Sequence, residues 1–374
     1  MALIMAQAFP DATMYTTLYD PAGTFPEFRD VVLRTSVINR VGLLRRHHRL
    51  ALPLLGPAVS GQRIEAEVLL ASSSGWAHGY RGAGRTVVYC HAPARWLYQR
   101  DRYLGGRAGA GVVDRVRGAA AGAMLAALAP ALLRWDRHAA DRADLYLANS
   151  TVTQRAIRAA YGIEAEVLPP PPAMLPAGDE QQVPGLEPGY LLCVARLLPY
   201  KNVDVVIEAA LLLGRQLVVV GDGPDRARLD GLVRSAGGSR GGAAGVTLLG
   251  RVDDPELRWL YRNASLLVAA SHEDYGLSPL EAGAFGRPAV VLRDGGYLDT
   301  VVENVTGTFF DAPQATLVAA AVEEASDRTW NDDALSSHVE AFAIPRFVDR
   351  LREVVNVQRG LLSGTRGTAR ERNQ

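Results

Sequence analysis

The sequence predicts an α/β protein made of two doubly wound, Rossmann-like domains that face a cleft. Short apolar runs rich in β-branched residues alternate with helical patterns on both sides of one proline- and glycine-rich break. The length of 374 residues also suits two domains better than one core.

Continuous apolar runs such as LVVV at 217–220 and LLVAA at 266–270 have no polar face, so helices should cover both faces of each strand. This is typical of parallel strands between helix layers. Helical periodicity predicts helices over 202–213 and 225–234. The predicted strands span 13–18, 66–71, 86–91, 145–148, 190–195, 217–220, 246–249, 266–270 and 289–292.

The break at 169–189 has many prolines and glycines, no periodicity, and a new strand directly after it. We interpret it as the connection between an N-terminal domain, residues 1–168, and a C-terminal domain, residues 190–344. Helical periodicity returns at 345–358, and the polar tail at 359–374 is predicted to be disordered.

The composition excludes several classes of protein. Forty basic and forty acidic residues cancel, so no global charge favours nucleic acid or an anionic membrane. Cys90 and Cys193 lie inside separate apolar runs, which argues against a disulfide framework or a zinc site. This cysteine usage fits a reducing cytosol. The longest apolar stretch, 119–133, is shorter than the roughly 20 residues of a membrane span, so we expect a buried helix there. No signal peptide is recognisable.

Most of the chemical information lies in residues 265–307. A buried strand ends near Ser271, and a helix is expected to begin near Ser278, with Pro279 at its first position and a Ser278–Glu281 capping box. The turn between them places Glu273 at the carboxyl end of a parallel strand, where open α/β sheets bind ligands. Free amides at the helix start suit a diphosphate.

A second element of this kind is expected at Gly295-Gly296, again after a strand and before a helix. The pattern alone leaves a simpler alternative open. Glu281 could merely cap its helix, and Glu273 could be a solvated turn residue.

The spacing ExxxxxxxE within HEDYGLSPLEAGAFGRPAV resembles the donor-site motif of glycosyltransferase family 4, retaining enzymes with the GT-B fold. The stretches VARLLPYKNVDVVIEA, VVVGDGPDRARL, LLGRVDDPELRWLYRNASLLV and GGYLDTVVENVTGTFF follow in the family's order. In the N-terminal half, VVYCHAPARWLY and LYLANSTVTQRAIRAAYG resemble the subgroup of O-antigen mannosyl- and rhamnosyltransferases.

This resemblance implies catalytic roles for four residues. Arg196 and Lys201 would neutralise the donor diphosphate as its negative charge grows, which makes a bound metal unnecessary. Glu273 would hold hydroxyls of the transferred sugar, and His91 would reach that sugar from the N-terminal domain. The simpler alternatives are that Arg196 and Lys201 are surface cations and that His91 is a structural histidine.

The resemblance also implies a set of donor-binding residues. Glu281 would accept hydrogen bonds from the ribose hydroxyls, and the backbone around Gly276, Leu277 and Ser278 would bind phosphate or sugar oxygens. Gly221 and Arg251 are further donor-binding candidates, although the glycine is also needed sterically in its strand-to-helix turn.

The expected function is transfer of a hexose, with mannose from GDP-mannose favoured, to a hydroxyl of a glycan or lipid-linked acceptor. No cofactor, metal or nucleic acid is expected, and the expected location is the cytoplasm. The alternatives are a nucleotide-sugar epimerase of similar fold and a truncated, inactive GT-B scaffold.

Three further features qualify this expectation. The basic stretch from Arg40 to Arg49 (RVGLLRRHHR) could contact the inner face of an anionic membrane or be a solvated helix face. Asp299 stands where the family's GGxxE-type motif carries Glu. The family's first strand and glycine-rich loop are missing before MALIMAQAF, and we expect in-frame DNA upstream to encode them.

Overall fold

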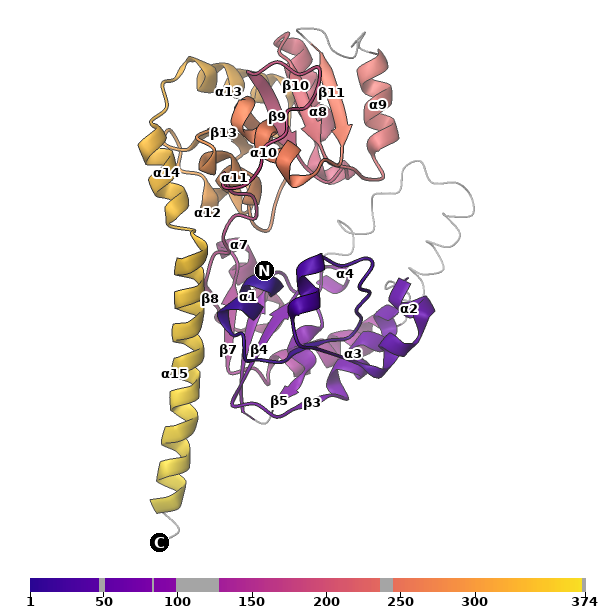
Figure 1. The fold of residues 1–374 in the computed structure, drawn as a ribbon, viewed down its shortest axis with the longest axis vertical. Helices are drawn as coiled ribbons and strands as arrows, with labels where there is room; N and C mark the ends of the chain where they lie inside the picture. The colour runs from indigo at the N-terminus through magenta and orange to yellow at the C-terminus, as the bar shows by residue number, and fades with distance from the viewer. Residues whose placement is uncertain (47–50, 83, 99–127, 236–244, 372–374) are drawn as a thin grey trace. The chain divides into compact units, whose positions relative to one another are not determined.

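The computed structural model describes residues 1–46, 51–82, 84–98, 128–235 and 245–371, which form two compact units (Figure 1). Unit 1 comprises Met1–Pro170 together with Ile344–Gln374, and unit 2 comprises Pro171–Ala343. Each unit has its own parallel β-sheet and its own buried core.

Unit 2 is built on six parallel strands in the order β11-β10-β9-β12-β13-β14. The chain moves outward from β9 to β11, then crosses back and moves outward again on the other side from β12. The reversal lies between β9 and β12, and such switch points are where open α/β sheets bind ligands. The strands are β9 (Tyr190–Val194), β10 (Leu217–Val220), β11 (Val246–Gly250), β12 (Ala264–Ala269), β13 (Ala289–Leu292) and β14 (Gly307–Phe310).

Helices connect these strands, as parallel pairing requires. Every residue of β10 is buried, which confirms the interpretation of LVVV as a strand covered on both faces. The connecting elements are η5 (Pro199–Lys201), α8 (Val203–Leu212), α9 (Arg226–Ser235), α10 (Asp254–Asn263), α11 (Leu277–Ala284), α12 (Tyr297–Thr300), α13 (Ala315–Asp327) and α14 (Asp332–Glu340).

Unit 1 contains a four-stranded parallel sheet in the order β4-β6-β7-β8 and two small parallel pairs, β1 with β2 and β3 with β5. The strands are β1 (Met14–Thr16), β2 (Leu33–Thr35), β3 (Arg63–Ile64), β4 (Val68–Ser73), β5 (Arg81–Gly82), β6 (Arg85–Cys90), β7 (Leu145–Ala148) and β8 (Glu166–Val167). The helices are α1 (Ala2–Ala8), η1 (Pro26–Asp30), η2 (Val37–Arg40), α2 (Gly42–Arg46), α3 (Leu52–Ser60), η4 (Ala77–Gly79), α4 (Arg95–Tyr98), a helix over 128–140, α7 (Thr151–Tyr161) and α15 (Ile344–Glu371).

The last helix belongs to unit 1. In α15, Phe347, Leu351 and Val354 are buried against Met5 of α1 and against β6. The helix continues to Glu371 (yellow in Figure 1), so the predicted end at 358 and the predicted disorder directly after it are wrong for residues 359–371.

The segment predicted as a connection between domains packs mainly on unit 2. Met174, Val183 and Leu186 are buried in the core of unit 2, although prolines and glycines surround them. Arg258 of α10 donates hydrogen bonds to the carbonyl oxygens of Leu175 and Asp179. The boundary between the units falls at Pro170, near the start of the predicted connection.

The predicted fold class, two doubly wound Rossmann-like domains, is confirmed. The short strands β2, β3, β5 and β8 and the strand β14 were not predicted, because two to four residues carry too little periodicity. Both cysteines are buried, and neither forms a disulfide. In the predicted buried helix at 119–133, residues 119–127 lie outside the described part, and 128–133 are helical. None of the described helices combines the length and apolar character that crossing a membrane requires.

Candidate functional site

The predicted donor-site residues of unit 2 lie along one edge of its sheet. Arg196, Gly221 and Arg251 follow the carboxyl ends of β9, β10 and β11, and Glu273 follows the carboxyl end of β12. Because all six strands are parallel, these ends meet at the same edge. The structure therefore brings together residues that are up to 77 positions apart in the sequence, from Arg196 to Glu273.

Lys201 and Glu273 form an ion pair across the switch point between β9 and β12. The Lys201 side chain is 12% exposed and that of Glu273 is 24% exposed, so the pair is partly shielded from water but open on one side. Lys201 is also the only lysine among the 374 residues, and every other cationic side chain of the Lys/Arg class is arginine. A side-chain ammonium group is thus present at one position only.

A chain of hydroxyl groups fixes the carboxylate of Glu273. The Ser271 hydroxyl donates a hydrogen bond of 2.6 Å to Glu273 Oε1, the oxygen that also meets Lys201. The Tyr297 hydroxyl lies 3.1 Å from Ser271 Oγ. Burial, and then the charge of Glu273, raise the pKa of Tyr297 well above its usual value, so its hydroxyl stays protonated and can donate. Neither Ser271 nor Tyr297 was singled out from the sequence as a partner of Glu273.

The second glutamate of the motif is almost fully buried. Glu281 Oε2 accepts a hydrogen bond of 2.7 Å from the Tyr261 hydroxyl, and Oε1 accepts one of 3.3 Å from the backbone N–H of Met174. Burial raises the pKa of Glu281, and these hydrogen bonds partly oppose the rise. A carboxylate held in this way is oriented before any ligand arrives.

The predicted capping box is wrong. Helix α11 begins at Leu277, its N-cap is Gly276, and no side chain caps it. Glu281 lies in the middle of the helix and bonds to Tyr261 of α10 instead of the N-terminal backbone. A capping box is present in α10, where Asp253 and the backbone and side chain of Glu256 bond reciprocally.

The uncapped start of α11 leaves amide groups for a ligand. The amides of Leu277 and Ser278 have no acceptor among the described residues, and the third position is a proline, which has no N–H. Leu277 is 38% exposed, so this helix end is reachable. These are the amides that the resemblance assigns to binding phosphate or sugar oxygens, which stays a prediction.

Tightly packed glycines hold the turn in place. A Cβ on Gly276 would lie 2.6 Å from Tyr297 Cδ1, and one on Gly295 would lie 2.4 Å from the carbonyl oxygen of Glu273. The N–H of Gly296 donates to that same oxygen, and the N–H of Gly295 donates to Asp294. The expectation that the glycine pair offers free amides to a phosphate is therefore wrong, because both are used within the protein.

Gly221 has a steric role. Its φ is +130°, and a Cβ would lie 2.0 Å from the carbonyl oxygen of Ala195, which only glycine avoids. Its N–H donates to the Gly250 oxygen. Arg196 and Arg251, on the neighbouring strand ends, are exposed, and no acidic partner is found for either among the described residues.

His91 lies in unit 1, at the carboxyl end of β6, and is described apart from the donor-site residues of unit 2. Its Nε2 lies 3.0 Å from Ser72 Oγ. Burial, followed by the amino group of Met1 and Arg95, lowers the pKa of His91 to about 4, so the imidazole is neutral at physiological pH. His272, beside Glu273, bonds to Asp294.

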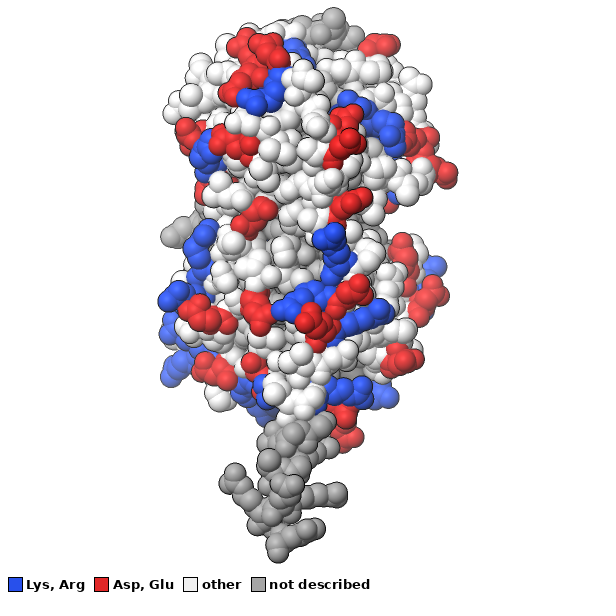
Figure 2. Space-filling model, turned by 90° about the vertical axis from the view of Figure 1, so that its left-hand side faces the viewer, with Lys and Arg blue, Asp and Glu red and all other residues white. Residues whose placement is uncertain are grey.

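Part of the basic stretch is described. Arg40 and Arg46 are exposed, as are the apolar side chains of Val41 and Leu43. His47, His48 and Arg49 lie outside the described residues. Elsewhere, Figure 2 shows acidic and basic side chains interspersed on the face that it displays, in agreement with the neutral composition. Within the described ranges, no group of three His, Cys, Asp or Glu residues is arranged to hold a metal ion.

Comparisons with known proteins show a similarity of unit 2 to glycosyltransferases. Residues 178–341 match the family model of the glycosyl transferases group 1. The D-inositol 3-phosphate glycosyltransferase of Mycobacterium tuberculosis is 35% identical over 134 residues, which are 35% of this chain and 28% of that protein. The matched part thus spans less than a third of the relative's length.

Solved structures of glycosyltransferases resemble the chain over most of its length. Sucrose-phosphate synthase from Thermosynechococcus elongatus has a TM-score of 0.61 at 18% identity, with 98% of this chain and 92% of that chain covered. Anabaena HepE in complex with UDP and glucose has 0.60 at 18%, covering 95% and 94%. A lipopolysaccharide outer core galactosyltransferase has 0.59 at 15%, covering 96% and 94%. At these identities the likeness shows the fold alone. The chain has the GT-B fold, and its residues 178–341 are similar to the glycosyl transferases group 1.

Proposed function

We propose that the chain is a retaining glycosyltransferase that moves a hexose from a nucleotide sugar to a hydroxyl of a glycan or lipid-linked acceptor. The observation that carries this proposal is the Lys201–Glu273 pair at the switch point of unit 2, beside the uncapped start of α11. Cations and free amides at one sheet edge suit a diphosphate leaving group.

The chemistry of Lys201 supports a direct contact with the diphosphate. A lysine ammonium is a small, strongly hydrated point charge, whereas arginine is a broad planar fork. In a chain that otherwise uses arginine, the single lysine pairs with Glu273 and its side chain is only 12% exposed. Glu273 keeps the ammonium in place without donor, and a bound donor would share it.

The other proposed site residues each contact a different part of the donor. Arg196 adds a second cation at the end of β9, so that no metal is needed to neutralise the leaving group. Glu281 accepts from the ribose hydroxyls, and Glu273 accepts from hydroxyls of the transferred sugar. The favoured donor is GDP-mannose, on the resemblance to the mannosyl- and rhamnosyltransferase subgroup. UDP-glucose is its main competitor, because HepE was solved with UDP and glucose.

The single lysine allows a direct test of this assignment. An amine-directed reagent should label the protein at Lys201 and at the amino terminus only, and a mass spectrum resolves the two. A bound nucleotide sugar should protect Lys201, while labelling at Met1 stays unchanged. If saturating donor left Lys201 fully reactive, the diphosphate role would be lost.

The dependence of the reaction on an acceptor distinguishes a transferase from the epimerase alternative. A transferase releases the nucleoside diphosphate in proportion to acceptor, whereas an epimerase converts the sugar nucleotide without any acceptor. The inactive-scaffold alternative predicts neither reaction.

We further propose that the protein works in the cytoplasm and contacts anionic membranes through the stretch from Arg40 to Arg49. Exposed Val41 and Leu43 beside the exposed Arg40 and Arg46 support this proposal, because apolar and basic side chains together favour an anionic lipid surface. The protein should bind phosphatidylglycerol vesicles and should not bind phosphatidylcholine vesicles. The Val41→Ser/Leu43→Ser variant should lose the binding to phosphatidylglycerol vesicles.

A further inference from the structure

Unit 1 contains a polar cavity of about 790 Å³ at the amino-terminal edge of its sheet. Thr86, at the start of β6, borders this cavity, whereas His91 follows the other end of the same strand. At 3.3 Å per residue, the two residues are roughly 16 Å apart. The cavity thus lies away from the carboxyl edge that the proposed function uses, and what it binds does not depend on that function.

Two arginines of the cavity stand side by side on neighbouring strands. Arg63 of β3 and Arg81 of β5 are register partners in a parallel pair, and both residues are exposed. Partners in such a pair are about 4.8 Å apart and extend to the same face. In the described part of the chain, neither arginine forms an ion pair with an acidic residue. Two guanidinium charges placed in this way repel each other unless an anion lies between them.

A third arginine reaches the same cavity from the segment between the helix over 128–140 and β7. The Nη2 of Arg142 donates a hydrogen bond of 3.4 Å to the carbonyl oxygen of Gly79, at the end of η4. Burial, and then the charge of Arg81, lower the pKa of Arg142, so the two arginines act on each other as like charges. Arg142, too, has no acidic partner among the residues that the structure describes.

The acidic side chains nearby do not neutralise these three arginines. Asp136 Oδ1 lies 3.1 Å from His78 Nε2, and Asp144 pairs with Arg85 at 3.2 Å. Of the residues that line the cavity, three are arginine and one, Glu65, is acidic. The lining therefore carries an excess of positive charge, which favours an anionic ligand.

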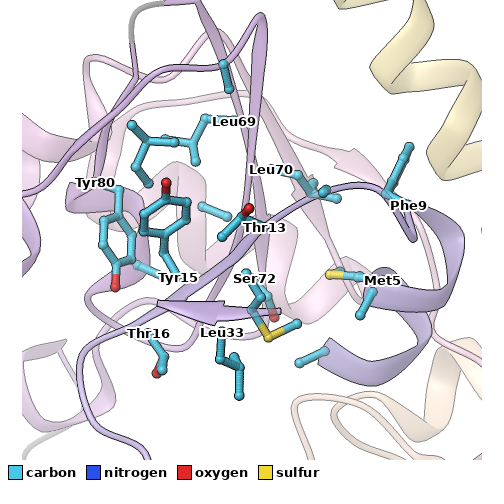
Figure 3. A pocket seen from close by; sticks show the side chains of 18 of the residues that line it. Met5, Phe9, Thr13, Tyr15, Thr16, Leu33, Leu69, Leu70, Ser72 and Tyr80 are labelled. Carbon is cyan, nitrogen blue, oxygen red and sulfur yellow. The ribbon is translucent and has the colours of Figure 1, made fainter. Parts of the chain in front are cut away.

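The buried hydroxyl of Tyr80 adds a hydrogen-bond donor to this wall. Tyr80 is 7% exposed and lines both the polar cavity and an apolar groove, in which Figure 3 shows it at the end opposite Met5 and Phe9. Its hydroxyl has no hydrogen-bond partner among the described residues. Burial raises the pKa of Tyr80 to about 12, so the hydroxyl stays protonated. A buried donor of this kind is costly unless a ligand or a water accepts from it.

We propose that this cavity binds the phosphate group of a small phosphorylated molecule, which the three arginines contact and to which the Tyr80 hydroxyl donates. Arginine suits this ligand because its planar guanidinium donates two parallel hydrogen bonds to a pair of phosphate oxygens. The volume of about 790 Å³ lies within the range of small-molecule sites, so it leaves room for an organic group beside the phosphate. A soluble phosphomonoester and the headgroup of a phospholipid share this chemistry.

Calorimetric titration of the full chain tests the proposal, with glycerol 3-phosphate and inorganic phosphate as probes and glycerol as the uncharged control. Arg81→Gln and Arg142→Gln should each weaken binding of glycerol 3-phosphate by roughly tenfold or more, because each removes a charged hydrogen bond to the phosphate. Arg134→Gln is the matched control and should not change the affinity. Arg134 is an exposed arginine of the helix over 128–140 that does not line the cavity.

Tyr80→Phe separates a role in binding from a role in packing. The hydroxyl has no described partner without ligand, so its removal should leave the melting temperature in phosphate-free buffer unchanged or raise it. The same change should weaken binding of glycerol 3-phosphate by roughly tenfold, because the phosphate loses a donor. A lower melting temperature together with unchanged affinity would contradict the role of Tyr80.

The two sources of the phosphate are distinguished with phosphatidylcholine vesicles that contain or lack phosphatidic acid. Binding to the phosphatidic acid vesicles that Arg81→Gln weakens would identify a lipid headgroup, and Arg81-dependent binding of glycerol 3-phosphate alone would identify a soluble phosphomonoester; both results support the site. Binding of none of these probes, or equal binding by Arg81→Gln, overturns the proposal. It is also overturned if Lys201→Ala abolishes binding and Arg81→Gln keeps it, because the phosphate would then lie at the donor site of unit 2.

Discussion

Removing the hydroxyl of Tyr261 tests whether the donor site depends on a residue outside the recognised motif. Tyr261 is fully buried, and the only polar atom of its side chain, the hydroxyl oxygen, donates a hydrogen bond of 2.7 Å to Glu281 Oε2. Tyr261→Phe deletes that donor and leaves the ring contacts in place, including the stacking on Phe285. The buried carboxylate then keeps the weaker bond from the Met174 amide at 3.3 Å.

The expected loss in the free energy of unfolding follows from the charge of the hydrogen-bond acceptor. A hydrogen bond to a charged group contributes about 1.5–3 kcal/mol, whereas one between neutral groups contributes about 0.5–1.5 kcal/mol. Tyr190→Phe is the matched control, because the hydroxyl of Tyr190 is buried in the same core and donates 2.9 Å to the neutral carbonyl of Leu260. Tyr261→Phe should therefore lower the free energy of unfolding of unit 2 more than Tyr190→Phe does, by about 1 kcal/mol or more.

Hydrogen exchange of the β10 amides under mild denaturant reports the unfolding of unit 2, and calorimetric titration reports donor affinity. Loss of the Tyr261 bond raises the pKa of Glu281 further, because that bond favours the charged form. Donor binding by Tyr261→Phe should weaken, and it should weaken further as the pH falls, because protonation removes an acceptor for the ribose hydroxyls. Equal stabilities of the two variants together with unchanged donor affinity would refute the assignment.

Lys201→Ala should lower turnover by roughly 10²–10³-fold, since it removes a charge that meets the leaving group, and normal circular dichroism would show that the fold survives. Tyr297→Phe should lower turnover less than Lys201→Ala does. In the double mutant with Ser271→Ala, it should add little to the loss caused by Ser271→Ala alone, because both hydroxyls act on Glu273 through one chain of hydrogen bonds. Additive losses in the double mutant would contradict this. Activity should persist in EDTA if Arg196 and Lys201 replace a metal, and activity lost in EDTA but restored by Mn²⁺ or Mg²⁺ would exclude that role. The pKa of His91 is about 4 in the folded chain against 6.5 in the unfolded chain, so the unfolded chain binds more protons between those values. The free energy of unfolding of unit 1 should therefore decrease as the pH is lowered from 6.5 to 4, by at most about 1.4 kcal/mol per pH unit. His91→Asn should flatten this dependence, and an unchanged slope would argue against the assignment.

The sequence predicted the parts of the fold that follow from local pattern. The buried strands at 145–148, 217–220 and 289–292 have the predicted bounds, because continuous apolar runs between polar turns are compatible with little else. The position of Glu273 at the carboxyl edge of the unit 2 sheet was also predictable, since a buried strand ends shortly before it, at Ala269. The capping box was predicted wrongly, because Ser278 and Glu281 have the spacing of a cap while the true N-cap is Gly276, two residues earlier.

What the sequence could not predict are contacts between distant segments. Met174 lies in a stretch without periodicity, yet its amide bonds a glutamate 107 residues away, and no local pattern carries that information. Tyr297 is 26 residues from Ser271 and joins it only because β12 and β13 are neighbours in the sheet.

The two glutamates of the motif illustrate the difference between finding a ligand-facing residue and finding what orients it. Glu273 is held at its backbone by Gly296, at its side chain by Ser271, and by the charge of Lys201. Glu281 is held by Tyr261 and by Met174. A flexible carboxylate loses side-chain entropy when it binds a ligand, so under the proposed function the residues that hold the two glutamates beforehand should contribute to donor affinity without touching the donor. Substitutions at these positions should therefore weaken donor binding even though every residue of the recognised motif remains in place.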